Sequence, residues 1–353
     1  MKKTLTLLLL AAMLTAPLAG CGDTTGTPTE TTEGADNGTT NGTTADPNGT
    51  TASTTAGTDD NVPEYNAADA NPASDFEYEV NDDGGITITK YIGADTDVVI
   101  PEKIDGKDVT VIGSYAFGRT NIVTVELPDT VTLLGTGAFE ECESLTTVRL
   151  SRQLKEIGVN AFQNCTSLSF IDLPSSLITI RACAFKYCTS LKQIKIPKSV
   201  SEYGYEIFAL SGIESVELED GLKSLGESMF IGCKLKEVSV PNSITILPLS
   251  VFSGNVDLES ITLHEGLKEI SSDAFGYNDK LTEIVIPASV ETVYESFVEV
   301  CASIQSVKFQ GNAPTFVNEE FYQKENLNYT VYYHEGATGF TTPEWNGYPA
   351  KTW

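Results

Sequence analysis

Large apolar residues recur along the chain at a nearly constant interval from about Val98 onward, and phenylalanine marks the register. The ten phenylalanines that define it are Phe117, Phe139, Phe162, Phe185, Phe208, Phe230, Phe252, Phe275, Phe297 and Phe321, with intervals of 22 to 24 residues. So regular an interval indicates an internal repeat in which every unit folds in the same way. We therefore expect about ten stacked units, because no unit can bury its apolar side alone.

One unit, residues 145–162, shows the elements that the pattern predicts. Its first six residues, LTTVRL, alternate apolar and polar positions and indicate a strand with one buried face. The following LKEI at residues 154–157 predicts a second short extended piece. The Ala-Phe step at 161–162 predicts a short helical turn that packs its ring into the core. The L-x-x-L-x-L pattern with this period is typical of a leucine-rich-repeat solenoid, a curved and β-rich stack.

Prolines and glycines mark the ends of these pieces. A proline ends the first strand in most units, where no further donor to the strand ladder is needed: Pro101, Pro128, Pro174, Pro197, Pro241 and Pro287. A glycine follows the second extended piece in five units, where we expect a tight bend: Gly113, Gly135, Gly158, Gly204 and Gly226.

Units of the form V-x-x-I-G-x-x-A-F-x-x-C-x-S-L-x-x-I-x-I-P resemble the BspA-like leucine-rich repeats of bacterial surface proteins. Residues 131–174 and 177–197 match this form closely, and the resemblance covers residues 76–353. It implies N-terminal cap strands at residues 74–100 and repeats at 101–315. A last repeat and a C-terminal cap follow at 316–353. Members of this family are described as adhesins for host matrix or as surface proteins of unknown partner.

The first 20 residues have the features of a signal peptide. Lys2 and Lys3 precede an apolar run that is too short to span a membrane comfortably, and small residues follow it. The next residue is Cys21, and Leu-Ala-Gly-Cys resembles a bacterial lipobox. The resemblance implies that the Cys21 thiol is lipidated, so that the protein is exported, anchored at the bacterial membrane and displayed outside the cell. The alternative is an ordinary signal peptide followed by a chance cysteine.

Residues 21–73 are a lipid-anchored tether in this interpretation. The segment is rich in Thr, Gly, Asn and Asp, and no lysine or arginine occurs between Lys3 and Lys90. A segment with so few large apolar residues cannot offset the entropy of ordering it, so we expect disorder. Like charges along it favour an extended chain.

The charge of the whole chain limits its partners. The formal net charge is −27, from 49 acidic and 22 basic residues. A strongly acidic protein has no electrostatic reason to approach a nucleic acid or an anionic lipid surface. We therefore expect no nucleic-acid partner, a membrane association only through Cys21, and a monomer.

The cysteines follow the repeat. Cys142, Cys165, Cys188, Cys233 and Cys301 occupy one slot, three residues after the register phenylalanine or four after Phe297. One cysteine per unit in one slot indicates a stacked column of small buried residues and not a four-ligand metal site. Cys183 lies close enough in sequence to approach Cys188, although no pair is established. We expect all six of these thiols to be reduced.

Catalytic signatures are absent from the sequence. The only histidines are His264 and His334, and no nucleophile elbow, zinc motif or phosphate-binding loop occurs. A glycosidase-type pair of carboxylates stays an alternative because acidic residues are abundant. A solenoid offers no deep pocket to raise one carboxyl pKa, however. We expect no enzyme activity, no cofactor and no metal.

The positions that vary between units point to the binding surface. Polar positions of L-x-x-L-x-L must point away from the core. In chain order the later one of each unit is Glu126, Arg149, Asp172, Lys195, Glu217, Ser239, Thr262, Val285 and Lys308. Two residues earlier stand Thr124, Thr147, Phe170, Gln193, Ser215, Glu237, Ser260, Glu283 and Ser306.

Phe170 is the only aromatic residue on this predicted face. We place a candidate contact site there, with Arg149 beside the ring and Asp172, Gln193 and Lys195 at its rim. Aromatic and arginine side chains concentrate binding energy in interfaces. A solvated sheet with a stray aromatic residue is the alternative. The leading functional hypothesis is an adhesin for an extracellular or host protein or glycan. Capture of a polysaccharide or peptide for uptake and a purely structural envelope role are the alternatives.

Overall fold

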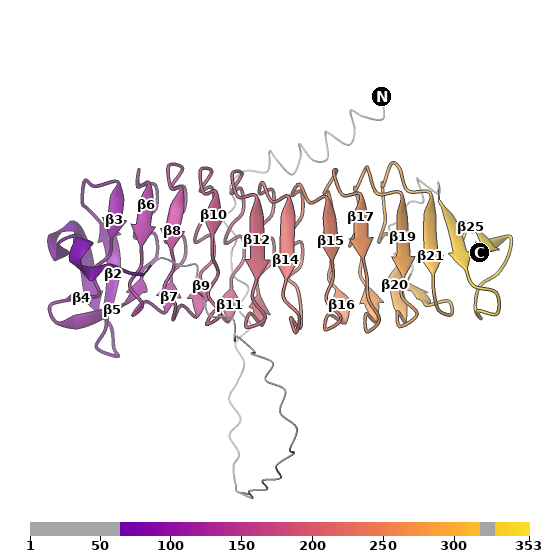
Figure 1. The fold of residues 1–353 in the computed structure, drawn as a ribbon, viewed down its shortest axis with the longest axis horizontal. Helices are drawn as coiled ribbons and strands as arrows, with labels where there is room; N and C mark the ends of the chain where they lie inside the picture. The colour runs from indigo at the N-terminus through magenta and orange to yellow at the C-terminus, as the bar shows by residue number, and fades with distance from the viewer. Residues whose placement is uncertain (1–63, 318–328) are drawn as a thin grey trace, which may run out of the picture. The chain divides into compact units, whose positions relative to one another are not determined.

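The computed structural model describes residues 64–317 and 329–353, which form a stack of coils (Figure 1). Most coils contribute one strand to a front row and a shorter strand to a back row, and neighbouring strands of a row run parallel. The fold is the predicted leucine-rich-repeat solenoid. The predicted register residue Phe321 and the lipidation site Cys21 lie outside the described residues.

The front row carries the L-x-x-L-x-L segments. It consists of β3 (Asp97–Val99), β6 (Thr124–Glu126), β8 (Thr147–Arg149), β10 (Phe170–Ile171), β12 (Gln193–Ile196), β14 (Ser215–Leu218), β15 (Glu237–Ser239), β17 (Ser260–Thr262), β19 (Glu283–Ile286), β21 (Ser306–Phe309), β23 (Thr330–Tyr333) and β25 (Tyr348–Thr352).

The back row carries the second extended pieces. It consists of β2 (Ile86–Tyr91), β5 (Lys107–Ile112), β7 (Leu133–Leu134), β9 (Glu156–Ile157), β11 (Thr179–Ile180), β13 (Glu202–Tyr203), β16 (Ile246–Leu247), β18 (Glu269–Ile270), β20 (Thr292–Tyr294) and β22 (Thr315–Val317). Three antiparallel additions complete the strands: β1 (Phe76–Val80) on β2, β4 (Lys103–Ile104) on β5 and β24 (Glu344–Trp345) on β25.

The folded body begins before the boundary that we predicted. Residues 64–73 were assigned to the tether, but they contain a 3-10 turn at Ala67–Asp69 and pack against the first coils. Asn71 is buried, and its backbone and side chain exchange hydrogen bonds of 2.9 Å with the backbone of Val99. The Tyr65 hydroxyl donates to the Ile100 carbonyl at 2.6 Å. Two specific polar anchors therefore order a segment whose composition alone predicts disorder.

The register phenylalanines form one continuous column inside the stack. Each of the nine from Phe117 to Phe297 is at most 1% exposed. Ring centroids from Phe117 to Phe275 lie 5.0–6.3 Å apart, and neighbouring rings are tilted by 22° or less. Each ring from Phe139 to Phe252 buries its faces against the rings of the coils before and after it.

The segment around each phenylalanine is not the helical turn that we predicted. The Phe139 N–H donates to the Ala161 carbonyl of the next coil at 2.8 Å, whereas the Ala138 N–H donates three residues back, to Gly135. This alternation repeats along the column and creates a third ladder between coils, called here the turn ladder. It requires a positive φ two residues before and two residues after most phenylalanines, for example at Asn160 and Asn164. Apolar and polar residues other than glycine accept this conformation because the inter-coil hydrogen bonds fix it.

The cysteine slot serves this ladder as well. The Cys165 thiol donates to the carbonyl of Phe139 in the preceding coil at 3.1 Å, and the other four slot cysteines do the same in their coils. Asn255 and Asn278 occupy the slot in cysteine-free coils and donate to the same kind of carbonyl. The slot therefore requires a small hydrogen-bond donor, a condition that the sequence pattern did not reveal.

The five slot cysteines are reduced, as the sequence predicts. All five are free and buried. Burial raises the pKa of the Cys188, Cys233 and Cys301 thiols to about 12, so they stay protonated and unreactive at neutral pH. Cys188 is free, so it forms no bridge with Cys183.

The recurrence of glycine after the second extended piece has a different cause from the one that we expected. A Cβ on Gly158 would lie 2.6 Å from the Leu134 carbonyl oxygen, and one on Gly204 would lie 2.0 Å from the Ala182 nitrogen. Neither residue has a positive φ. Close approach of neighbouring coils, and not a tight bend, therefore selects glycine at these positions.

Both strand rows are interrupted near the middle of the stack. The front row is not paired between β10 and β12, between β14 and β15, or between β17 and β19, and the back row is not paired between β13 and β16. On the back row, Pro248 stands where Gly158 and Ser271 donate an N–H to the preceding coil, and proline has no N–H to give. The turn ladder continues across the interruption, where Phe208 and Phe230 donate to Met229 and Val251. The coils here are held mainly by their interior.

We predict that Phe185→Ala destabilises the repeat body, the folded part of the chain at residues 64–353, by about 3–5 kcal/mol. The substitution leaves a ring-sized cavity between two stacked neighbours. Phe185 is fully buried and lies 5.2 Å from both Phe162 and Phe208. Urea denaturation of residues 64–353 measures the change. Phe170→Ala, which removes an exposed ring, is the matched control and should change stability by less than about 0.5 kcal/mol. Equal midpoints for the two variants would contradict the register.

Candidate binding face

The front row presents the outward side chains that the sequence predicts. Most are exposed or half-buried, and only Arg149 and Ser306 among them are buried. Phe170 is the most exposed phenylalanine that the structure describes, at 51%. An exposed ring of this size on a rigid strand costs solvation free energy in the free protein, which contact with a partner would recover.

Four of the five predicted site residues meet at one shallow depression. Phe170 from β10, Asp172 just after it, and Gln193 and Lys195 from β12 line a hollow of about 280 Å³. Ser215 and Glu217 of β14 line its other side, and Ile171, Ile194 and Val216 line the remainder. The sequence reasoning missed the two β14 residues. They stand at the positions of Gln193 and Lys195 one unit later, so the repeat itself was the signal.

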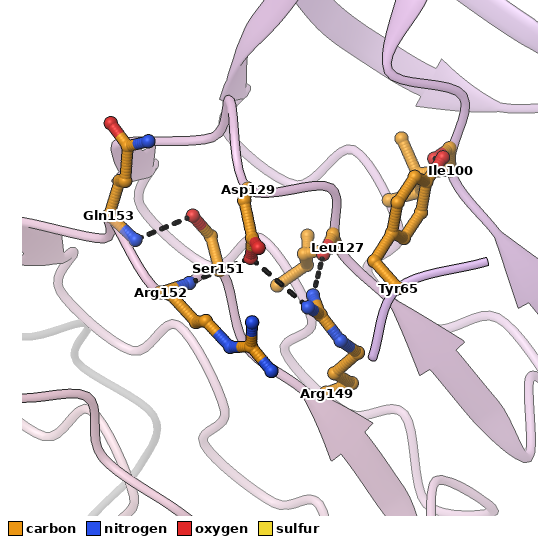
Figure 2. Close-up of polar contacts among 8 residues, drawn as sticks. All are labelled: Tyr65, Ile100, Leu127, Asp129, Arg149, Ser151, Arg152 and Gln153. Atoms are coloured by element: carbon orange, nitrogen blue, oxygen red, sulfur yellow. Dashed lines mark hydrogen bonds and ion pairs between the residues drawn. The ribbon is translucent and has the colours of Figure 1, made fainter. Parts of the chain in front are cut away.

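Arg149 is not part of this depression, and the prediction that it is exposed is wrong. Its side chain is 3% exposed. Figure 2 shows the guanidinium turned toward the end of the strand, where it donates to the Leu127 carbonyl at 2.6 Å and to Asp129 at 3.1 Å. The Tyr65 ring lies against it, with 5.6 Å between the guanidinium carbon and the ring centroid.

The cause is the ordered segment that precedes β1. Tyr65 holds that segment in place through Ile100 and closes the solvent side of Arg149 (Figure 2). Burial raises the pKa of Tyr65 to about 12, so the phenol stays neutral and serves as a hydrogen-bond donor. Asp129 also accepts the Arg152 backbone N–H at 3.0 Å. Arg149 is therefore a structural residue that joins three coil segments.

Lys195 is neutralised by two carboxylates of the next coil. Its ammonium lies 3.1 Å from Glu217 and 3.0 Å from Glu219. Hydrogen bonds to Glu219 and Glu217 raise the pKa of Lys195, so it remains protonated. The pairing fixes the position of Lys195 at the rim and cancels its charge as seen by an approaching ligand.

A second depression of about 440 Å³ adjoins the first. It lies over the interruption between β14 and β15 and is lined by Val216, Glu217, Leu218, Asp220, Ser239, Pro241, Asn242 and His264. Val216 and Glu217 line both hollows. The sequence did not indicate this second hollow, because nothing in the repeat pattern marks where the ladder opens.

The described residues also define what this part of the chain lacks. No group of three or more His, Cys, Asp or Glu side chains among residues 64–317 and 329–353 is arranged to hold a metal ion. Within the same residues, no helix has the length and apolar character needed to cross a membrane.

Comparison with known families agrees with the coil geometry. Residues 110–235 and 204–328 match the family described as "BspA type Leucine rich repeat region", in six copies. The chain belongs to this family. No curated protein matches the chain significantly. Repeat proteins of this type are in general binding proteins without catalytic activity, which is consistent with the absence of catalytic motifs from the sequence.

Solved structures of bacterial leucine-rich-repeat proteins resemble this BspA-type chain. A leucine-rich repeat protein from Bacteroides ovatus shares 24% identity over 79% of this chain and 75% of its own, with a TM-score of 0.63. The T. pallidum leucine rich repeat protein shares 30% identity over 60% of this chain and 90% of its own, with a TM-score of 0.48. Pneumococcal vaccine antigen PcpA shares 17% identity over 74% and 78%, with a TM-score of 0.42. The first of these supports the fold and none identifies a ligand.

We predict that Arg149→Ala lowers stability by about 1–3 kcal/mol, because it leaves the Leu127 carbonyl and Asp129 without their charged donor. Arg152→Ala is the matched control, since its backbone N–H keeps the bond to Asp129. Thermal and urea denaturation of both variants measure the difference. An Arg149→Ala protein as stable as Arg152→Ala would show that the buried contact contributes nothing.

Proposed function

We propose that this chain is a surface-displayed, lipid-anchored binding protein whose front row acts as an adhesin toward an extracellular protein or glycan. The observation that carries the proposal is Phe170, a half-exposed ring on a rigid strand beside a polar hollow. Binding energy in interfaces concentrates at such aromatic anchors, and polar groups around them supply orientation.

Membership of the BspA-type family supports a binding role. The stack provides a long row of outward side chains that the core does not constrain, which is the surface that repeat proteins commonly use for ligands. Four of the predicted contact residues converge on one hollow, whereas Arg149 no longer belongs to the proposed site.

Export and anchoring are supported by sequence alone. Lys2, Lys3 and the apolar run precede Leu-Ala-Gly-Cys21, and the acidic segment that follows suits a spacer between a lipid and the repeat body. A lipid with two or three acyl chains is sufficient for stable membrane attachment.

We predict that Phe170→Ala weakens binding of a ligand found on a glycan and matrix-protein array by about 2 kcal/mol or more. That change corresponds to about a 30-fold higher Kd. Surface plasmon resonance with residues 64–353 measures it. Ile178→Ala is the control, because Ile178 is also exposed, at 41%, but stands next to the back-row strand β11.

Two outcomes of this experiment would count against the proposal. A ligand that binds Phe170→Ala as tightly as the natural protein removes the site from the front-row hollow. A broad array without any saturable ligand argues against an adhesin and in favour of a structural envelope role.

We predict that Cys21→Ser moves the protein from the membrane fraction to the soluble fraction or leaves it unprocessed, because serine cannot accept the lipid on a thiol. Detergent partitioning and intact mass of the mature protein measure this. Cys165→Ser is the control and should remain membrane-bound, since Cys165 is a free cysteine inside the repeat body and serine keeps a small hydrogen-bond donor there. A lipidated mature mass for Cys21→Ser would show that the lipobox interpretation is wrong.

A further inference from the structure

The two depressions of the front row form one groove across the strands. They share Val216 and Glu217 as lining residues, so the hollow at Phe170 continues into the hollow at His264. The groove crosses from β10 to the turn after β17 and passes over the interruption between β14 and β15. A ligand in it would run along the stack and not along a strand.

The charge of this groove is one-sided. Lys195 is its only lysine or arginine, and Glu217 and Glu219 already pair with it. Asp220 lies exposed at the other side of the strand end and makes no ion pair with a described residue. Glu217 shares Lys195 with Glu219, so these residues together with Asp220 present three carboxylates and one cation to a ligand. Ser239, Asn242 and His264 add neutral polar groups beyond them.

The distance along the stack between the Phe170 ring and the carboxylates sets the spacing between the two contact groups of a ligand. Phe170 lies in β10 and Glu217 in β14, two coils further along the stack. Neighbouring coils are 5.2 Å apart at the phenylalanine column. Two steps amount to about 10 Å, which is close to the advance of three residues in the polyproline II conformation, where side chains three positions apart lie on the same face.

We infer that the groove binds a peptide segment in the polyproline II conformation that carries an apolar residue and a lysine or arginine three positions apart. The apolar side chain covers the Phe170 ring, and the cation reaches Glu217 and Asp220. This inference rests on the proposed function and specifies the ligand of the same site. Opposite charge selects a basic segment over an acidic one and over a neutral glycan, and it accelerates the encounter with this acidic protein.

The test uses labelled nine-residue Gly-Ser peptides and fluorescence anisotropy with the natural repeat body. The probe peptides carry one leucine and one arginine three positions apart, in either order, because the groove does not fix the direction of the peptide. Three comparison peptides place glutamate for arginine, serine for leucine, or leucine and arginine next to each other. We expect at least one probe peptide to bind about fivefold or more tightly than each comparison peptide. Raising the salt concentration from 0.05 to 0.5 M should weaken it severalfold.

The matched variants are Glu217→Gln with Asp220→Asn, and Glu237→Gln. Lys195 keeps Glu219 at 3.0 Å in the double variant, so no ammonium loses its last partner. Glu237 is exposed on β15 of the same row but does not line the groove. The double variant should lower the affinity of the probe peptide about fivefold and Glu237→Gln by much less. Circular dichroism confirms that both variants fold.

The outcomes separate this inference from the proposed function. Equal binding of arginine and glutamate peptides, no binding of any probe peptide, or normal binding by the double variant would overturn the inference. An array ligand that depends on Phe170 but is neutral and insensitive to the double variant would also overturn it while the proposed function stands. An array ligand that ignores Phe170 contradicts both.

Discussion

Eight consecutive coils of this protein, from Phe117 to Phe275, each place a phenylalanine ring on the ring of the coil before or after it, and the interior of the stack is built on that contact. The rings lie 5.0–6.3 Å apart. The shorter of these distances are close to the spacing that parallel strands need for their hydrogen bonds. The turn ladder and the cysteine slot then saturate the backbone groups around each ring. These contacts involve only interior side chains and backbone groups. The outward-facing residues of the front row can therefore differ from coil to coil.

The break in strand pairing near the middle of the stack reflects the same separation between the interior contacts and the strand rows. Both strand rows lose their pairing near the coil that contains Phe230, yet the ring stack and the turn ladder continue through it. The ring spacing is 5.4 Å from Phe208 to Phe230 and 5.8 Å from Phe230 to Phe252, and it reaches 6.3 Å at the next step, where the back-row strands pair again. The interior contacts therefore hold neighbouring coils together where the strands do not pair, and the two hollows of the front row lie over two such steps, β10 to β12 and β14 to β15.

The sequence predicted what the repeat imposes and missed what single contacts decide. Period, strand positions and the buried phenylalanines follow from a pattern that ten units share. The turn ladder does not, because residues such as Asn160 adopt a positive φ only when the next coil holds them. Arg149 occupies an outward position by pattern, but Tyr65, more than 80 residues earlier in the chain, covers it. A single contact between distant segments does not appear in the repeat pattern. The sequence therefore located the candidate site at Phe170 but did not define which neighbouring residues belong to it.

The acidity of the chain bears on how the groove stays accessible. A tether next to a binding face is at high local concentration and can compete with external ligands. Here the segment between Lys3 and Lys90 contains no lysine or arginine, and the groove presents Glu217 and Asp220. Like charges repel within a Debye length of about 8 Å at physiological ionic strength. The segment therefore cannot supply the cation that the groove is inferred to bind, and its acidic residues disfavour its own entry. A basic external segment meets no cationic competitor from residues 4–89, so the acidic composition of the proposed tether suits the acidic groove inferred for the ligand.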